Sequence, residues 1–357
     1  MRFFLLFCTL ISSLLALPSD VELKKMIGHM LVVGFDDATI NAQSPIVKEL
    51  QTYELGGVIL FDRFYKERNR TKNISSPEQL KELTKQLKYY AKRPLLISID
   101  QEGGKVARLK PSYGFAEIPS AFTLSKTSLE HAKNVYNAMA QMLKDNGINC
   151  DFGPVVDLAV NEKNSVIVGL ERSYGQESET VTQFAKVFID ALKSKGVISV
   201  LKHFPGHGSS LGDSHLGFVD VTQTWSEKEL EPYQKLIASN SVSMIMSAHV
   251  YNAKLDATYP ATLSYAINSK LLREKMHYNG VLISDDLQME AISKFYTLKD
   301  TVTLAINSGI DMLLFGNQLS QTKTDEIVET IMAQVKNGAI SLERIIEANE
   351  RIARLNL

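Results

Sequence analysis

The sequence repeats one pattern eight times: a short apolar run, a few polar or glycine residues, then an amphipathic stretch of helical length. Short apolar runs fit buried strands, and longer amphipathic stretches fit surface helices. Strands that alternate with helices form a parallel sheet covered by those helices. The expected strands are Met30–Phe35, Gly57–Phe61, Leu95–Asp100, Ile148–Leu158, Val197–His203, Ser243–His249, Val281–Asp285 and Met312–Phe315.

Eight strand–helix units favour an α/β fold of the (β/α)8 TIM barrel type, as a single domain over residues 18–357. An open doubly wound sheet is the alternative, but no G-x-G-x-x-G segment opens the first helix. A last helix closes the chain, so we expect no second domain. The expected helices are Pro77–Ala91, Leu129–Asn146, Ser178–Lys195, Glu227–Ser239, Asn268–Met276, Leu298–Ser308 and Ser341–Arg354.

Residues 1–17 have the features of a signal peptide. Arg2 supplies a positive charge, the run from Phe3 to Leu15 is nearly all apolar, and Ala16 is a small residue at a plausible cleavage point. The run is shorter than the ~20 residues that span a bilayer, so we expect no stable membrane span. The sequence thus predicts an exported protein, periplasmic or secreted. If this segment belonged to the fold instead, the protein would be cytoplasmic.

Composition argues against a disulfide-stabilised scaffold and against a nucleic-acid-binding protein. Without the leader only Cys150 remains, so we expect no internal disulfide and a core large enough to be stable unaided. The 39 basic and 40 acidic residues give no electrostatic case for nucleic-acid binding. We expect a monomer, and we interpret the basic stretch Arg63–Lys72 as a solvated loop rather than a binding patch.

Polar side chains gather after five of the expected strands. The C-terminal ends of barrel strands carry the active site, so this clustering indicates function. A single aspartate after a strand is commonly a helix N-cap, which would account for Asp286 or Asp100 alone but not for the whole set. The set comprises Asp100–Gly104 with Arg108, Asp157 with Glu171–Gly175, Lys202–His215, His249, and Ser284–Asp286.

The segment Lys202–His215 holds three of the seven histidines. A polar surface loop is one interpretation of such a segment. A zinc site is another, with ligands from His203, His207, Asp213 and His215. Neither an H-E-x-x-H helix nor a cysteine pair accompanies these residues, so we predict no metal and no cofactor.

Carboxylates beside Lys, Arg and His suit a polyhydroxylated ligand, because charged groups strengthen hydrogen bonds to sugar hydroxyls. Cleaving a glycosidic bond with retention ordinarily takes two carboxylates about 5 Å apart, a nucleophile and an acid/base. Asp285 can be the nucleophile. A histidine with a pKa of ~6.5 can replace the second carboxylate, and Asp213 is placed to orient His215 for that role.

Three separated motifs, in order, resemble glycoside hydrolase family 3: Asp100-Gln101-Glu102-Gly103-Gly104 with Arg108, the Lys202–His215 segment, and Ser284-Asp285-Asp286-Leu287. The resemblance runs from Leu23 to Leu357. It is closest to the compact, single-domain bacterial β-N-acetylhexosaminidases.

This resemblance implies a TIM barrel, retention through a covalent glycosyl-enzyme, and no metal. Asp285 would be the nucleophile, His215 the acid/base and Asp213 its partner. His207 and His249 would line the pocket without a chemical role. The N-acetylglucosamine (GlcNAc) would be bound by Asp100, Arg108, Arg172, Lys202 and His203.

Compact members of this family are usually cytoplasmic and recycle muropeptides by removing GlcNAc from anhydro-muramic acid. An export signal would instead suggest trimming of peptidoglycan fragments or related glycans outside the cytoplasm. Three alternatives stay open: a β-glucosidase or β-xylosidase, which usually has a second domain; a phosphorylase, since a neutral histidine would not repel phosphate; and a catalytically inactive sugar-binding protein.

Overall fold

Eight parallel strands form one sheet in the computed structural model, which describes residues 18–213, 217–355 and 357. Their spatial order is β11-β9-β7-β6-β3-β2-β1-β12, and a parallel bridge between Ile283 and Met312 joins the two ends of the sheet. The predicted (β/α)8 barrel is therefore confirmed. The strands are β1 (Leu31–Gly34), β2 (Gly57–Ile59), β3 (Leu96–Ile99), β6 (Cys150–Asp151), β7 (Ile198–Phe204), β9 (Met244–Ser247), β11 (Val281–Ser284) and β12 (Leu313–Phe315).

Each expected strand is present, but the fourth is much shorter than the apolar run Ile148–Leu158. Pairing of β6 stops at Asp151, shortly before Gly153 and Pro154. Proline has no amide hydrogen to donate and glycine weakens a strand interior, so the regular strand ends here. Beyond it, Val155 forms an isolated parallel bridge with Lys202 of β7.

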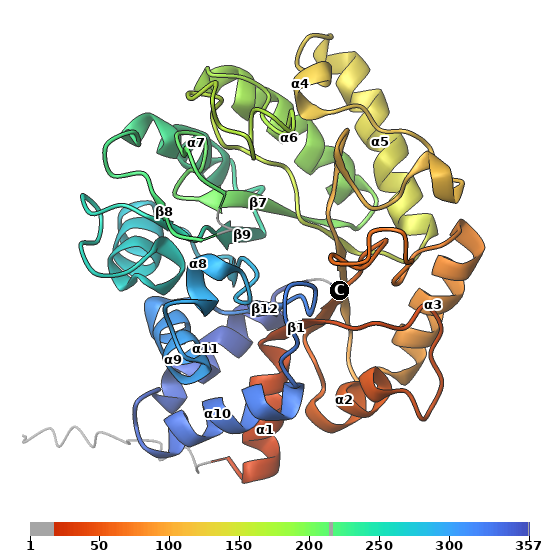
Figure 1. Cartoon of the computed structure of the whole chain (residues 1–357), viewed down its shortest axis with the longest axis vertical. Helices are drawn as coiled ribbons and strands as arrows, with labels where there is room; N and C mark the ends of the chain where they lie inside the picture. The colour runs from red at the N-terminus through yellow and green to blue at the C-terminus, as the bar shows by residue number, and fades with distance from the viewer. Residues whose placement is uncertain (1–17, 214–216, 356) are drawn as a thin grey trace, which may run out of the picture.

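Helices surround the strands, as Figure 1 shows. The seven expected helices are found, with two differences in detail: residues 227–239 divide into a 3-10 turn (Glu227–Leu230) and α7, and the segment Ala266–Lys275 is a π-helix. Helices α1, α2 and α10 were not predicted. The helices are α1 (Asp20–His29), α2 (Pro45–Tyr53), α3 (Pro77–Tyr90), α5 (Leu129–Asp145), α6 (Ser178–Ser194), α7 (Glu231–Ala238), α9 (Leu298–Ser308), α10 (Thr324–Lys336) and α11 (Leu342–Ala353).

Helix α5 illustrates how the sequence sets these elements. Ser128 accepts a hydrogen bond from the amide of His131 at 3.1 Å and so caps the helix start. Tyr136, Met139 and Leu143 recur at helical spacing and are fully buried against the barrel. At the other end of the chain, α10 and α11 pack beside α1, which brings the first and last helices together (Figure 1).

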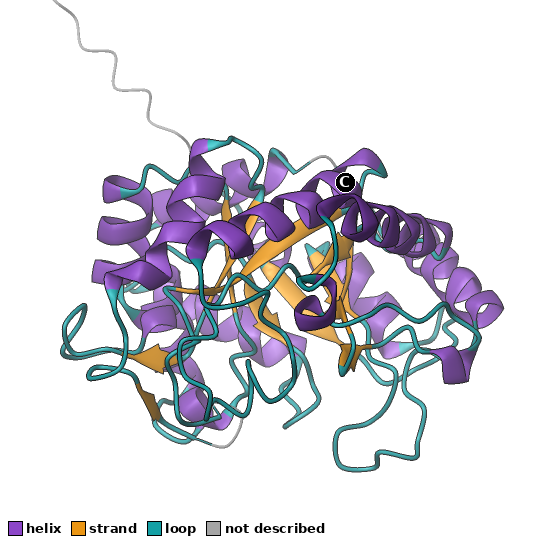
Figure 2. Cartoon of the chain, turned by 90° about the horizontal axis from the view of Figure 1, so that it is seen from above, coloured by secondary structure: helices purple, strands orange, loops and turns teal. Residues whose placement is uncertain are grey.

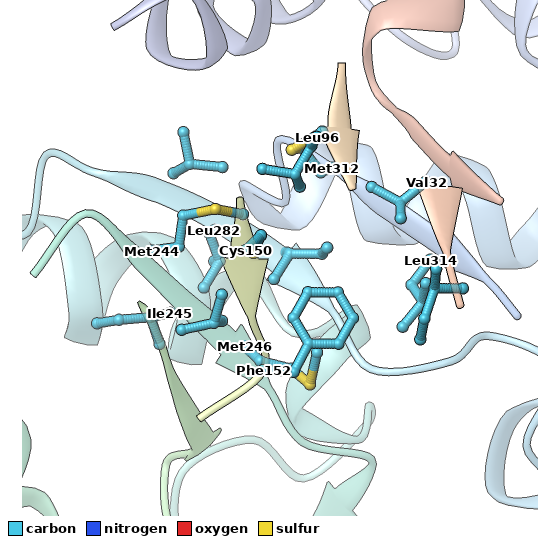
Figure 3. Packing of buried hydrophobic residues seen from close by; sticks show 14 of the residues in the cluster. Val32, Leu96, Cys150, Phe152, Met244, Ile245, Met246, Leu282, Met312 and Leu314 are labelled. Carbon is cyan, nitrogen blue, oxygen red and sulfur yellow. The ribbon is translucent and has the colours of Figure 1, made fainter. Parts of the chain in front are cut away.

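Apolar side chains fill the barrel in layers (Figure 3). Cys150, Met244 and Met312 are fully buried, and the next inward-facing residues along their strands are Phe152, Met246 and Leu314. Because side chains in a strand alternate between faces, a step of two residues moves one layer toward the C-terminal end of the barrel. This last layer closes the core beneath the loops, which gather at one end of the molecule (Figure 2).

The sulfhydryl of Cys150 is free and buried. Among the described helices, none is long and apolar enough to cross a bilayer. The predicted signal peptide, residues 1–17, lies outside the described residues.

At the opposite end of the barrel, a buried carboxylate binds three arginines. One oxygen of Asp311 lies 2.5 Å from Arg344 and 3.0 Å from Arg351, both on α11. The other lies 2.6 Å from Arg273 of the π-helix and accepts the amide of Leu282 at 3.0 Å. This group ties two helices to the first residues of the strands.

We predict that Asp311→Ala lowers the free energy of unfolding by about 3–5 kcal/mol, because it leaves three partly buried arginines without their counter-charge. Urea denaturation measures the change. Glu347→Ala is the matched control: it removes an exposed carboxylate that pairs with two of the same arginines, and should cost under about 1 kcal/mol. Equal effects of the two substitutions would contradict the prediction.

Candidate active site

A cavity of about 410 Å³ opens among the loops at the C-terminal ends of the strands. Its floor is apolar and includes Phe152, Met246 and Leu314, the last layer of the barrel core. Its walls are mostly charged. Every predicted site residue that the structure describes lines this cavity: Asp100, Arg108, Arg172, Lys202, His203, Asp213 and Asp285. His215 lies outside the described residues.

The segment after β3 folds back on itself. Gly103 and Gly104 have φ angles of +97° and +55°, and a Cβ on Gly103 would lie 2.3 Å from the carbonyl oxygen of Pro119. Only glycine fits there. The turn pairs Gln101–Gly103 (β4) with Val106–Ala107 (β5), and it returns Arg108 to within 3.0 Å of Asp100. The spacing of eight residues between the two thus becomes a contact.

Buried ion pairs continue from Asp100 across the barrel. Lys202, at the end of β7, lies 2.8 Å from Asp100 and 2.7 Å from Glu102. Glu102 accepts two hydrogen bonds of 2.8 Å from the guanidinium of Arg172. We call the resulting set the charged network; its members are Arg108, Asp100, Lys202, Glu102, Arg172, His203 and Asp157.

The network fixes the charge of its members. Burial disfavours the ionised forms of Asp100 and Glu102, but the neighbouring cations more than offset it and hold both pKa values below their usual range. For Lys202, burial also opposes ionisation, and the two carboxylates outweigh it, so its pKa is raised. These three side chains therefore stay charged at neutral pH.

Asp157 orients His203. One of its oxygens lies 2.7 Å from Nδ1 of His203, and the other accepts the amides of His203 and His207. Nε2 of His203 lies 3.3 Å from Arg172. Contacts at both ring nitrogens thus hold the imidazole of His203 in one orientation between Asp157 and Arg172.

In the segment Lys202–His215, hydrogen bonds from neighbouring side chains hold the backbone of His207 and Gly208 in place. The side-chain amide of Asn164 donates to the carbonyls of His207 and Gly208, at 2.8 and 3.1 Å. Glu229, which is 1 % exposed, accepts the amide of Gly208 at 3.0 Å. A Cβ on Gly208 would lie 1.7 Å from the carbonyl oxygen of Leu158, so this close approach requires glycine. The chain then leads to Asp213 at the cavity wall.

Asp285 follows β11. Its amide donates to the carbonyl of Ser247 at 3.1 Å, and its carboxylate accepts the amide of Asp286 at 2.8 Å. Asp286 accepts the amides of Gln288 and Gly316. The N-cap of the next helix, α8 (Glu290–Ser293), is Met289, so the helix-cap interpretation of Asp286 is wrong: it stabilises a turn. Asp100 likewise caps no helix.

His207 and His249, the two histidines expected to line the pocket without a chemical role, differ in position. His207 lines the cavity, and burial together with the nearby His203 lowers its pKa to about 4, so it is neutral at pH 7. His249 was expected to line the cavity and does not. Its ring lies 2.8 Å from Thr262 and 2.9 Å from the carbonyl of Asp286, so it supports the turn from outside.

Sequence reasoning left several cavity or network residues out of the predicted site. Glu102 stood inside the motif, and Asp157 followed a strand, yet neither was assigned a role. Arg63, Tyr65 and Arg68 belong to the loop after β2, which was interpreted as solvated. Nothing in spacing alone shows that this loop folds over the cavity.

The described residues include no group of three or more His, Cys, Asp or Glu side chains arranged to hold a metal ion. The zinc interpretation also involved His215, which is not described.

Residues 22–355 match the model of the glycosyl hydrolase family 3 N-terminal domain. With the barrel and the charged cavity in place, this match shows that the chain belongs to glycoside hydrolase family 3, as its motifs predict.

Particular relatives narrow the class. A β-hexosaminidase of Tolumonas auensis is 38% identical over 269 residues, 74% of this chain and 76% of the relative. β-Hexosaminidase A of Pseudoalteromonas piscicida is 31% identical over 89% of this chain. A solved family 3 β-N-acetylglucosaminidase from Paenibacillus has a TM-score of 0.84 at 32% identity over 93% of this chain. This chain spans 56% and 61% of the last two proteins. Together they support a glycoside hydrolase of the β-N-acetylhexosaminidase class.

Glu229, the buried carboxylate that holds the segment Lys202–His215, predicts how the stability of the protein depends on pH. Burial raises the pKa of Glu229 to about 7. A carboxyl group whose pKa is higher in the folded state stabilises the fold fully below its unfolded pKa, near 4.5, and this contribution is lost as pH rises to about 7. We therefore predict that Glu229→Gln, which cannot ionise, gains stability relative to the native chain as pH rises from about 5 to 8. The gain should reach about 2–3 kcal/mol.

Urea unfolding of both proteins across this pH range measures the difference. Glu227→Gln, an exposed carboxylate on the same 3-10 turn, is the matched control and should show no such trend. A difference between Glu229→Gln and the native chain that stays constant with pH would refute the assignment.

Proposed function

We propose that this protein is a retaining β-N-acetylglucosaminidase that removes terminal, non-reducing GlcNAc from peptidoglycan fragments (muropeptides) or related glycans. One observation carries the proposal: Asp285 lines the same cavity as the oriented cations and carboxylates of the charged network. A sugar held by the network would lie over the apolar floor, within the same cavity as a carboxylate nucleophile. The relatives named above support the sugar; the peptidoglycan source rests on the family resemblance.

The reaction would take two steps. The Asp285 carboxylate attacks the anomeric carbon, the bond to the leaving oxygen breaks, and His215 protonates that oxygen. His215, now neutral, takes a proton from water, whose oxygen displaces Asp285 and restores the carboxylate. Two inversions give net retention. Asp213 would orient His215 and stabilise its charged form, as a carboxylate does in hydrolase triads.

The network would bind the sugar through its remaining hydrogen-bonding capacity. Asp100 is 17% exposed and Arg108 is 25% exposed, so both present polar atoms to the cavity while their mutual contact fixes their orientation. Ionised partners strengthen hydrogen bonds to hydroxyl groups. The more deeply buried members, Glu102 and Asp157, would act by positioning Lys202, Arg172 and His203.

Replacing Asp285 tests the nucleophile. We predict that Asp285→Ala lowers kcat by about three or more powers of ten, as removal of a covalent nucleophile does, while the protein still unfolds cooperatively. Release of p-nitrophenol from its β-N-acetylglucosaminide measures turnover, with the β-glucoside run in parallel. Asp190→Ala, an exposed carboxylate on α6, is the control and should keep full activity.

Normal turnover by Asp285→Ala would show that the nucleophile lies elsewhere. Preference for the plain glucoside would keep the barrel and the nucleophile but replace the substrate class with that of a β-glucosidase.

We also propose that residues 1–17 direct export and that the enzyme acts in the periplasm or outside the cell. The charged start and apolar run of this segment support the proposal. The full chain expressed in a bacterium should then be recovered outside the cytoplasm with a new N-terminus near residue 18. Recovery in the cytoplasm with Met1 intact would exclude it.

A further inference from the structure

The loop after β2, residues 60–73, forms one wall of the cavity mouth, and we call it the rim loop. It was expected to be solvated, yet Arg63, Tyr65 and Arg68 all line the cavity. They come from a different strand end than any residue of the charged network. This wall is therefore open to a part of the substrate other than the sugar bound by the charged network.

The rim loop has a defined fold. Arg63 and Thr71 form an antiparallel bridge, and the amide of Phe64 donates to the carbonyl of Arg70 at 3.1 Å. Gln318, from the loop after β12, donates to the carbonyl of Arg63 at 2.9 Å and accepts the amide of Tyr65 at 3.2 Å. The side chains on this wall are therefore presented by a supported backbone.

Two of the five basic residues of the rim loop already have structural partners. Lys72 is buried and lies 2.8 Å from the carbonyl of Asn317 and 3.1 Å from Asp36. The Arg70 guanidinium stacks on Phe64 at 4.1 Å from the ring centre and also pairs with Glu67. Their charges are used within the protein and do not face a ligand.

Arg68 is different. It is exposed and lines the cavity, and it makes no ion pair or hydrogen bond with any residue that the structure describes. Arg63, beside it on the wall, is 3.9 Å from Asp62, a carboxylate that Lys110 also pairs. The cavity mouth thus carries cationic charge that the protein itself does not neutralise.

Tyr65 adds a second kind of contact. The residue is 41% exposed and lines the same cavity as the two arginines. An aromatic face is a suitable surface for the apolar side of a sugar ring, while a guanidinium binds a carboxylate through two parallel hydrogen bonds. The wall therefore combines the contacts that a carboxylate-bearing sugar needs.

We propose that Arg68, together with Tyr65 and Arg63, forms the subsite for the leaving part of the substrate and selects a leaving group that carries a carboxylate. This inference rests on the proposed function, which assigns the other end of the same cavity to GlcNAc. It changes the role of Arg63–Lys72 from a solvated loop to a determinant of specificity.

Two disaccharides test the subsite: GlcNAc β-1,4-linked to N-acetylmuramic acid, and N,N′-diacetylchitobiose, which is GlcNAc β-1,4-linked to GlcNAc. Their leaving sugars differ by the lactyl ether that carries the carboxylate. The measured quantity is the ratio of kcat/KM for the first to kcat/KM for the second. We expect Arg68→Ala to lower this ratio about 2–5-fold, the range for one exposed ion pair. Arg68→Glu should lower it further, and Arg68→Lys should restore part of it.

Salt and a neighbouring residue provide the controls. Raising the salt concentration from about 50 to 500 mM should lower the kcat/KM ratio of the native protein toward one, since exposed charges are screened. Lys66→Ala removes a cation of the same loop that does not line the cavity. It should leave kcat/KM for both disaccharides unchanged.

An unchanged ratio in Arg68→Ala, whether both rates fall together or neither falls, overturns the subsite and leaves the proposed function standing. A native protein that releases GlcNAc from neither disaccharide nor the p-nitrophenyl substrate overturns the proposed function itself.

Discussion

The contact between Lys202 and two carboxylates, Asp100 and Glu102, is the interaction on which the rest of the cavity depends. A buried ammonium is stable only beside negative charge, and a buried carboxylate only beside positive charge. Each member of the charged network thus has a required place, and removing one would leave its neighbours uncompensated. The network costs desolvation energy. In return, polar atoms of several strand ends are held in fixed directions before a ligand arrives.

The barrel makes this arrangement possible because it has two distinct ends. At the N-terminal end of the strands, Asp311 and its arginines join helices to the barrel and have no access to the cavity. At the C-terminal end, the apolar core stops at Phe152 and Met246, and the loops above are charged. Stability and chemistry are thereby separated, so the loops can change without loss of the core.

Much of the fold and part of the site could be predicted from the sequence. Strand and helix periodicity is local, so the eight units and most helices were placed correctly. Asp100 and Arg108 were correctly assigned to the same motif and cavity, and the double glycine between them forms the turn that brings them into contact. Asp157 was included among the strand-end residues but given no role, since its partner His203 is far away in sequence and a lone aspartate after a strand fits many roles. The catalytic roles of Asp285, Asp213 and His215 stay predictions.

By itself the sequence determined the barrel, its family, and the set of polar residues at the strand ends, because alternation, glycine turns and motif order are properties of the chain. Only the tertiary structure decided which of these residues meet. Lys202 lies 102 positions from Asp100, and Arg172 lies 70 from Glu102. Closure of the sheet brings these residues, which are distant in the sequence, within hydrogen-bonding distance. The same closure places Arg68 at the cavity mouth, since the position of a loop depends on what it packs against.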